Sequence, residues 1–102
     1  MPILAPTPAE RIVDAKGRPY FLWDEDLTLE AFRVRLADPD PEVRAYYLGK
    51  LMRQAKPDDV FTFASLREIG ELFPRLARYL GKTRAFWTWV LEHWKVVPHG
   101  AG

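Results

Sequence analysis

The amino-acid sequence predicts a mostly α-helical protein, a compact stack of five or six short helices preceded by a β-hairpin or an extended arm. Helix-starting residues recur along the chain, apolar residues follow them at spacings of three and four, and only one segment has hairpin-turn chemistry. The 102 residues suffice for one modest core and are too few for two. We therefore expect a flexible Pro-rich arm over residues 1–9, a single helical domain over residues 10–96 and a loose tail over residues 97–102.

The first segments are expected to be extended. Three prolines in the arm remove backbone donors and favour an extended chain, which can lie against the domain or become ordered on a partner. Two apolar runs then flank Asp14–Gly17, where Asp at the start and Gly at the end are typical of a hairpin loop. The sequence therefore predicts a β-hairpin at about residues 11–22, packed on the helices through Tyr20, Phe21 and Trp23.

Two helix starts follow the hairpin segment. Thr28 is a typical N-cap residue, and its helix is expected to end before Pro39, because the residue before a proline leaves the α region. Asp40 and Pro41 then combine a cap with a residue suited to the first helical position. The second helix is expected to run to about Gln54.

The second half of the chain is predicted to be helical throughout. A short helix is expected over residues 57–63, and Ser65 with Glu68 forms a capping box that starts the next one. We expect Pro74 to break this helix and to begin another that ends at Gly81. The last helix is expected at about residues 84–95, with an inward apolar face made of Phe86, Trp87, Val90, Leu91 and Trp94.

Composition excludes several classes of function. The chain has no cysteine, which rules out disulfides, thiolate zinc sites, iron–sulfur clusters and a cysteine nucleophile. Fifteen Lys and Arg against fourteen Asp and Glu give a net charge of +1, so no strong overall field favours nucleic acid or an acidic membrane. The longest apolar run, Tyr20–Trp23, is far too short to cross a bilayer, and no secretory leader is recognisable. We expect a cytoplasmic protein without a membrane segment.

The charged clusters favour structural roles over catalysis. Residues 24–26 lack the glycine turn of a calcium loop, and Asp38, Asp40 and Glu42 alternate with prolines as at a helix start. His93 and His99 do not have the spacing of metal ligands on one helix, and no glycine-rich phosphate loop is present. We therefore expect no catalytic residues, no metal, no cofactor and no enzymatic activity.

The candidate binding groups are several aromatic residues and a basic run over residues 75–84. Together they indicate a protein partner, a nucleic-acid partner or, for the basic run, a merely solvated helix face. Trp89 lies away from the centre of the last helix's apolar face, so it is either an exposed anchor or covered by the hairpin. The expected partner-binding residues are Tyr20, Phe21, Trp23, Arg75, Arg78, Lys82, Arg84 and Trp89.

Two resemblances extend this interpretation. Residues 38–48 resemble the second-helix start of HEAT-type repeats, which implies a HEAT-like stack. Residues 17–24, 41–47 and 84–87 resemble a group of small bacterial proteins that tend to be encoded beside abortive-infection (AbiEii-like) nucleotidyltransferase toxins. The second resemblance implies an antitoxin or accessory subunit that masks such an enzyme. The alternative is a small nucleic-acid-binding regulator that uses the basic run over residues 75–84.

Overall fold

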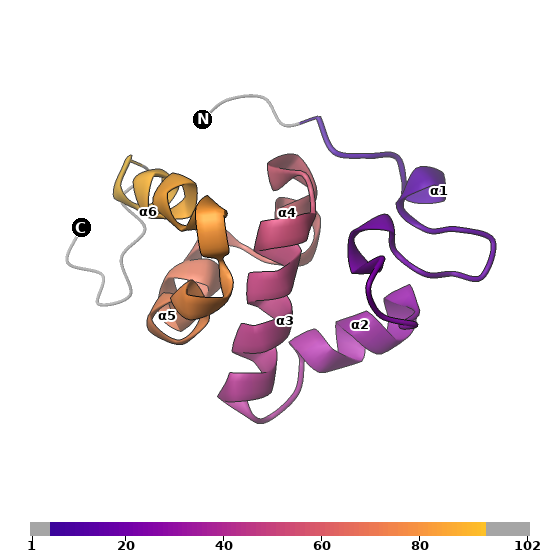
Figure 1. Ribbon diagram of the computed structural model, residues 1–102, viewed down its shortest axis with the longest axis horizontal. Helices are drawn as coiled ribbons and strands as arrows, with labels where there is room; N and C mark the ends of the chain where they lie inside the picture. The colour runs from indigo at the N-terminus through magenta and orange to yellow at the C-terminus, as the bar shows by residue number, and fades with distance from the viewer. Residues whose placement is uncertain (1–4, 94–102) are drawn as a thin grey trace.

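The computed structural model describes residues 5–93, and α- and 3₁₀-helices make up most of that range (Figure 1). The Cα radius of gyration, 13.5 Å, is close to the roughly 13 Å of a folded 100-residue domain, so the predicted mostly helical, compact fold is confirmed. The elements are α1 (Ala9–Ile12), the 3₁₀ turn η1 (Tyr20–Leu22), α2 (Leu29–Leu36), α3 (Pro41–Gln54), α4 (Pro57–Phe63), α5 (Leu66–Leu76), the 3₁₀ turns η2 (Ala77–Tyr79) and η3 (Gly81–Thr83), and α6 (Arg84–His93).

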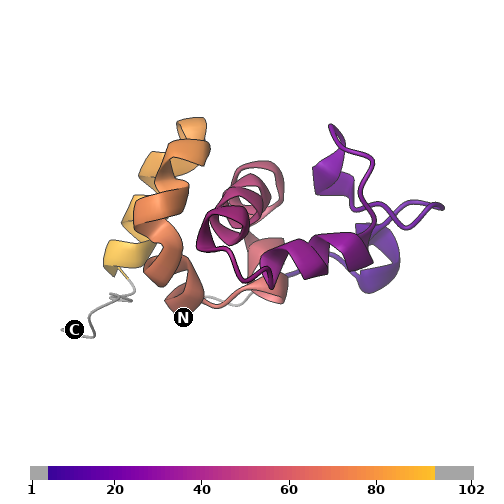
Figure 2. The ribbon, with the colours of Figure 1, turned by 90° about the horizontal axis from the view of Figure 1, so that it is seen from below.

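Helix α3 is the centre of the molecule. It contacts α2 on one side and α5 on the other, and Figure 2 shows α5 and α6 standing together at one end, with α2 and the N-terminal segment at the other. Leu48, Leu51 and Met52 of α3 are buried between these two groups. A change in α3 therefore affects both ends of the protein.

Side-chain caps set the starts of α2, α3 and α5, as the sequence predicts. The Asp40 carboxylate accepts a hydrogen bond from the Glu42 backbone N–H at 2.9 Å, ahead of Pro41. Ser65 and Glu68 form both bonds of the capping box, at 3.1 and 3.0 Å. Such caps contribute about 1 kcal/mol each.

Aromatic rings fill the core. Phe21, Phe32 and Phe63 meet edge to face with centroids 5.2–5.7 Å apart, and the first two are completely buried. Trp87 is also buried and donates its indole N–H to the Met52 carbonyl at 3.0 Å, which ties α6 to the end of α3. Most of the large aromatic fraction is therefore structural.

The predicted β-hairpin is wrong. A single antiparallel bridge joins Val13 to Pro19, α1 occupies the start of the expected first strand, and η1 occupies the end of the second. Proline has no N–H to continue a ladder. Phe21 and Leu22 are both buried, and a 3₁₀ turn allows this where a strand would direct adjacent side chains to opposite faces. The expected turn chemistry does hold, because Gly17 has φ +77°.

Two details of the C-terminal half differ from expectation. Helix α5 continues through Pro74 to Leu76, so the expected break lies beyond the proline, where the chain tightens into η2. Phe86 keeps 43% of its surface exposed and does not share the buried face of Trp87. Residues 94–102, including Trp94 and the expected tail, lie outside the described residues.

The described part of the N-terminal arm lies against α4. The Ala5 N–H donates to the Asp58 carboxylate at 2.9 Å, and Thr7 binds Asp59. The sequence left open whether the arm lies against the domain or becomes ordered on a partner, and residues 5–8 lie against the domain. The HEAT-type arrangement of the helices stays a prediction.

Candidate functional site

The predicted partner-binding residues fall into two groups at opposite ends of the molecule. Figure 1 shows the segment with η1 on one side of α3 and the segment with α6 on the other. The molecule measures 44 Å along its longest axis, so the two groups do not form one continuous patch. Each group is considered separately below.

At the N-terminal end, only one of the three predicted aromatics faces solvent. Trp23 is 73% exposed, whereas Phe21 is completely buried and packs in the core instead of facing a partner. Tyr20 is partly buried and its hydroxyl is directed inward to Asp59. Trp23 is therefore the aromatic available for contact at this end.

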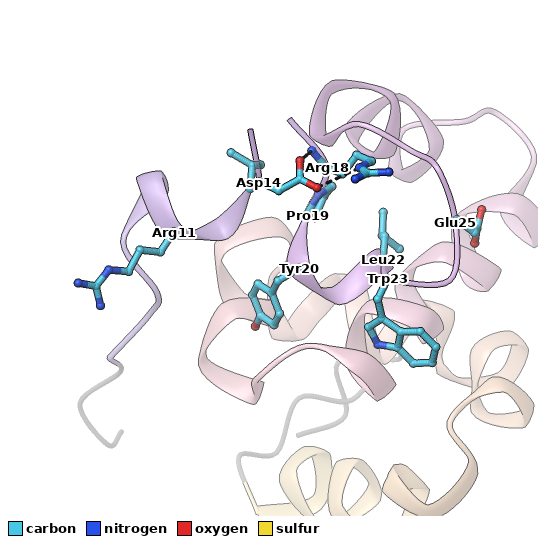
Figure 3. Close-up of a pocket in the computed structure, with 9 residues that line it drawn as sticks. Arg11, Asp14, Arg18, Pro19, Tyr20, Leu22, Trp23 and Glu25 are labelled. Carbon is cyan, nitrogen blue, oxygen red and sulfur yellow. Dashed lines mark hydrogen bonds and ion pairs between the residues drawn. The ribbon is translucent and has the colours of Figure 1, made fainter. Parts of the chain in front are cut away.

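Trp23 borders a cavity of about 410 Å³ (Figure 3). Its lining is mixed, with the apolar Val13, Pro19 and Leu22 beside charged side chains such as Arg18 and Glu25. Arg18 is already paired with Asp14 at 2.9 Å, and the side chains of Arg11 and Trp23 extend to different sides. The polar groups do not converge on one point, so the cavity lacks the arrangement that fixes a small molecule.

A buried carboxylate holds the arm and η1 against α4. Asp59 is completely buried and accepts hydrogen bonds from the Thr7 N–H at 2.6 Å, the Thr7 hydroxyl at 2.7 Å and the Tyr20 hydroxyl at 2.5 Å. We call these three residues the Asp59 cluster. Burial alone would raise the pKa of Asp59, but these hydrogen bonds outweigh it and lower the pKa. Burial and the bond to Asp59 raise the pKa of Tyr20 to about 12.

A buried lysine fixes the segment behind Trp23. Lys50 of α3 is 4% exposed, and its ammonium lies 2.7 Å from Asp24 and 2.6 Å from Glu25. Burial alone would lower the pKa of Lys50, but the two carboxylates raise it. The bond to Lys50 also lowers the pKa of Asp24. These ion pairs attach the backbone that follows Trp23 to α3, so the exposed indole is carried by a segment that is held in place.

The basic run at the other end divides into paired and unpaired cations. Arg75 and Arg78 both bind Glu42 of α3, the latter at 2.8 Å. Arg78 also stacks on Tyr79 with its guanidinium carbon 4.9 Å from the ring centre. Within residues 5–93, Lys82 and Arg84 form no ion pair. The run therefore offers fewer free charges than the sequence indicates.

Helix α6 presents an aromatic surface to solvent. Trp89 is 49% and Phe86 43% exposed, and the His93 ring lies 4.3 Å from the Trp89 ring. Their spacing of three and four residues places them on one side of the helix. We call Phe86, Trp89 and His93 the α6 outer face. Of the two alternatives for Trp89, the structure has the exposed one, because the hairpin segment that would have covered it lies at the other end.

A second hollow, of about 310 Å³, lies between α2, α3 and α5. Leu36, Leu48 and Leu72 are among its apolar lining residues. At its rim, Arg44 is bound to the Asp38 carbonyl at 2.7 Å and Arg75 to Glu42. Its charges already have internal partners, which makes it a weaker candidate than the two exposed tryptophans.

The acidic groups weighed as metal ligands have structural roles. Asp40 caps α3, Glu42 binds the two arginines, and Asp24 binds Lys50. In residues 5–93, no group of three or more His, Asp or Glu side chains is arranged to hold a metal ion. No helix in that range has the length and apolar character needed to cross a membrane.

Sequence analysis did not anticipate the Asp59 cluster, because Thr7 and Tyr20 are 52 and 39 residues away from Asp59 and no local signal joins them to it. Lys50 did carry a signal, since it occurs among the apolar positions of α3. Comparison with family models, curated proteins and solved structures found no match.

Proposed function

We propose that this chain is a non-enzymatic protein-binding module, an antitoxin or accessory subunit that masks a partner enzyme in the cytoplasm. The observation that supports this proposal is the pair of exposed tryptophans, Trp23 and Trp89, on a domain whose core is already filled by other aromatic rings. Tryptophan is one of the side chains most enriched among interface hot spots. The sequence resemblance to small proteins encoded beside nucleotidyltransferase toxins supports such a toxin as the partner.

The masking would be steric and electrostatic. Trp23 follows η1 and Trp89 belongs to α6, and these elements lie on opposite sides of α3 (Figure 1), so a partner that contacts both tryptophans would have a wide area of its own surface covered. Lys82 and Arg84, just before and at the start of α6, add positive charge at this end of the molecule, which would steer an acidic partner surface towards it. Tyr20 contributes indirectly, because it fixes the turn that carries Trp23.

Nucleic-acid binding through the basic run is the competing proposal. The engagement of Arg75 and Arg78 by Glu42 weighs against it, because phosphate affinity depends on the number of free cations. Titration with duplex DNA and with RNA at two salt concentrations separates the two proposals. Tight, strongly salt-dependent binding would favour the nucleic-acid regulator.

Co-expression with an AbiEii-like nucleotidyltransferase toxin from the same organism tests the proposal. We expect a stoichiometric complex, and we expect Trp23→Ala, Trp89→Ala and Arg78→Ala each to weaken it while the circular dichroism spectrum stays that of the wild type. Val34→Ala is the matched control, since Val34 is 64% exposed on α2 and is not an aromatic anchor. Absence of a complex, or full affinity in all three variants, would contradict the proposal.

A further inference from the structure

The described part of the N-terminal arm is attached to α4 by hydrogen bonds to two adjacent carboxylates. Residues 5–8 pass α4 before α1 begins (Figure 1). The Ala5 N–H donates to Asp58 at 2.9 Å. Asp59 accepts from the Thr7 N–H at 2.6 Å and from the Thr7 hydroxyl at 2.7 Å. These hydrogen bonds connect the arm to a helix more than 50 residues further along the chain.

The arm has the chemistry of a Pro-rich peptide ligand. Prolines at positions 6 and 8 have no N–H, so Ala5 and Thr7 carry all the backbone donors of residues 5–8, and both donors bind α4. Pro8 has φ −56° and ψ 145°, which are values of an extended polyproline II segment. Such a segment is preformed and loses little conformational entropy when it binds. Both prolines are exposed, so the attachment depends mainly on the hydrogen bonds.

The groups that receive the arm are held in place without it. Asp59 lies on α4 and is completely buried, and the Tyr20 hydroxyl shares this carboxylate with the arm. Tyr20 precedes Phe21 and Leu22, which are both buried in the core, and its hydroxyl also accepts from the Lys56 N–H at 2.9 Å. The acceptor and its neighbouring hydroxyl therefore form a preformed site, and the arm is the separately attached part.

This difference indicates which segment can replace the arm. The arm of a second copy would form the same hydrogen bonds that the tethered arm already forms at high effective concentration, so exchange between copies gains nothing. A segment of another protein can form these hydrogen bonds and add contacts of its own. The second kind of segment is therefore the one able to displace the arm.

We propose that Asp58, Asp59 and Tyr20 form a binding site for an extended Pro-rich segment of another protein, and that the arm is an autoinhibitory strap that fills this site. The segment carries Thr or Ser at the place of Thr7, because the hydroxyl donates to the buried carboxylate. Asp58 accepts from a backbone N–H two residues earlier, as it does from Ala5. This inference goes beyond the proposed masking function and does not depend on it.

Binding of a synthetic peptide to the full chain tests this proposal. The probe is a fluorescent, N-acetylated peptide with the sequence of residues 1–9, and the same peptide with Thr7→Val is its control. Fluorescence anisotropy measures the affinity of both peptides for the wild-type chain and for the full-length variant Thr7→Val, in which the arm lacks its hydroxyl bond. Thr62→Val is the matched control variant, since Thr62 is an exposed threonine of α4.

We expect the Thr7→Val chain to bind the threonine peptide about tenfold more tightly than the wild-type and Thr62→Val chains do, because its own arm competes less well. The peptide with Thr7→Val should bind this chain about tenfold more weakly than the threonine peptide does. Equal affinity of the two peptides would overturn the proposal. A dimer in light scattering that Thr7→Val dissociates would overturn it in favour of a second copy.

Amide hydrogen exchange of the wild-type chain tests the strap without any variant. We expect the Thr7 N–H to exchange through local opening, at a rate that low urea concentrations do not change, whereas the Leu51 N–H within α3 exchanges faster as urea is added. A Thr7 N–H that exchanges only when the whole domain unfolds would show that the arm is an integral part of the core and would overturn the proposal.

Discussion

The Asp59 cluster allows a sharp prediction through the change Tyr20→Phe. This variant keeps the ring and removes only the hydroxyl, which donates to the buried Asp59 carboxylate at 2.5 Å and accepts from the Lys56 N–H at 2.9 Å. Hydrogen bonds to charged groups contribute about 1.5–3 kcal/mol. The Lys56 N–H bond lies at the surface, so water replaces it at little cost. We therefore expect a loss of about 2 kcal/mol in the free energy of unfolding.

Urea denaturation followed by circular dichroism measures this loss, and a thermal melt should show a fall in Tm of about 10 °C for a domain of this size. Tyr46→Phe is the matched control, because the Tyr46 ring is 39% exposed. It should change stability by less than about 0.5 kcal/mol. An equally small effect of Tyr20→Phe would show that the Tyr20 hydroxyl is solvated and would refute the role assigned to the cluster.

Three further predictions concern packing, the buried ion pair and pH. In Gly49→Ala, the new Cβ would lie 2.9 Å from the Tyr79 Cβ, which is too close for an unstrained contact. We therefore expect urea melts to show a loss of about 1–3 kcal/mol in the free energy of unfolding. A stabilised variant would contradict the close packing of α3 on η2. Lys50→Met leaves the carboxylates of Asp24 and Glu25 without their cation. Because these side chains are 33% and 28% exposed, we expect the free energy of unfolding to fall by about 2 kcal/mol, which is less than the 3–5 kcal/mol lost when a fully buried pair is broken. A urea melt identical to that of the wild type would contradict this role of Lys50. The lowered pKa of Asp59 predicts that its contribution to stability is present above about pH 4 and is lost as the pH falls through the folded-state pKa. The pKa of Tyr20, raised to about 12, predicts that its contribution is lost as the pH rises from about 10 to about 12; Tyr20→Phe should reduce this alkaline loss, and an unaltered alkaline profile would count against it.

The parts of the fold that could be predicted from sequence are those that local chemistry determines. The caps at Asp40 and Ser65 and the turn at Gly17 depend on a few neighbouring residues and agree with the structure. Hairpin and 3₁₀ turn were not distinguishable at Tyr20–Leu22, because the same apolar residues suit both, and only tertiary burial of two adjacent side chains decides between them.

For the candidate binding residues too, sequence predicted what depends on neighbouring residues and did not predict what depends on tertiary contacts. Sequence identified Trp23 and Trp89 as candidates and left the exposure of Trp89 open, since the face that a helix buries depends on its neighbours. It placed Phe86 on the inner side because the apolar stripe of α6 is wide, whereas the structure buries only its Trp87 side. The pairing of Arg78 with Glu42 joins residues 36 apart and has no local signal, so the number of free cations could not be predicted.

Masking of the partner enzyme is the central claim, and titration of enzyme activity tests it most directly. A candidate AbiEii-like nucleotidyltransferase from the same organism would be assayed for nucleotidyl transfer while the purified chain is added at concentrations above and below that of the enzyme. We predict that activity falls in proportion to added chain and is lost at stoichiometric amounts, and that Trp89→Ala requires a clear excess for the same loss. Full activity in the presence of excess bound chain would contradict the claim.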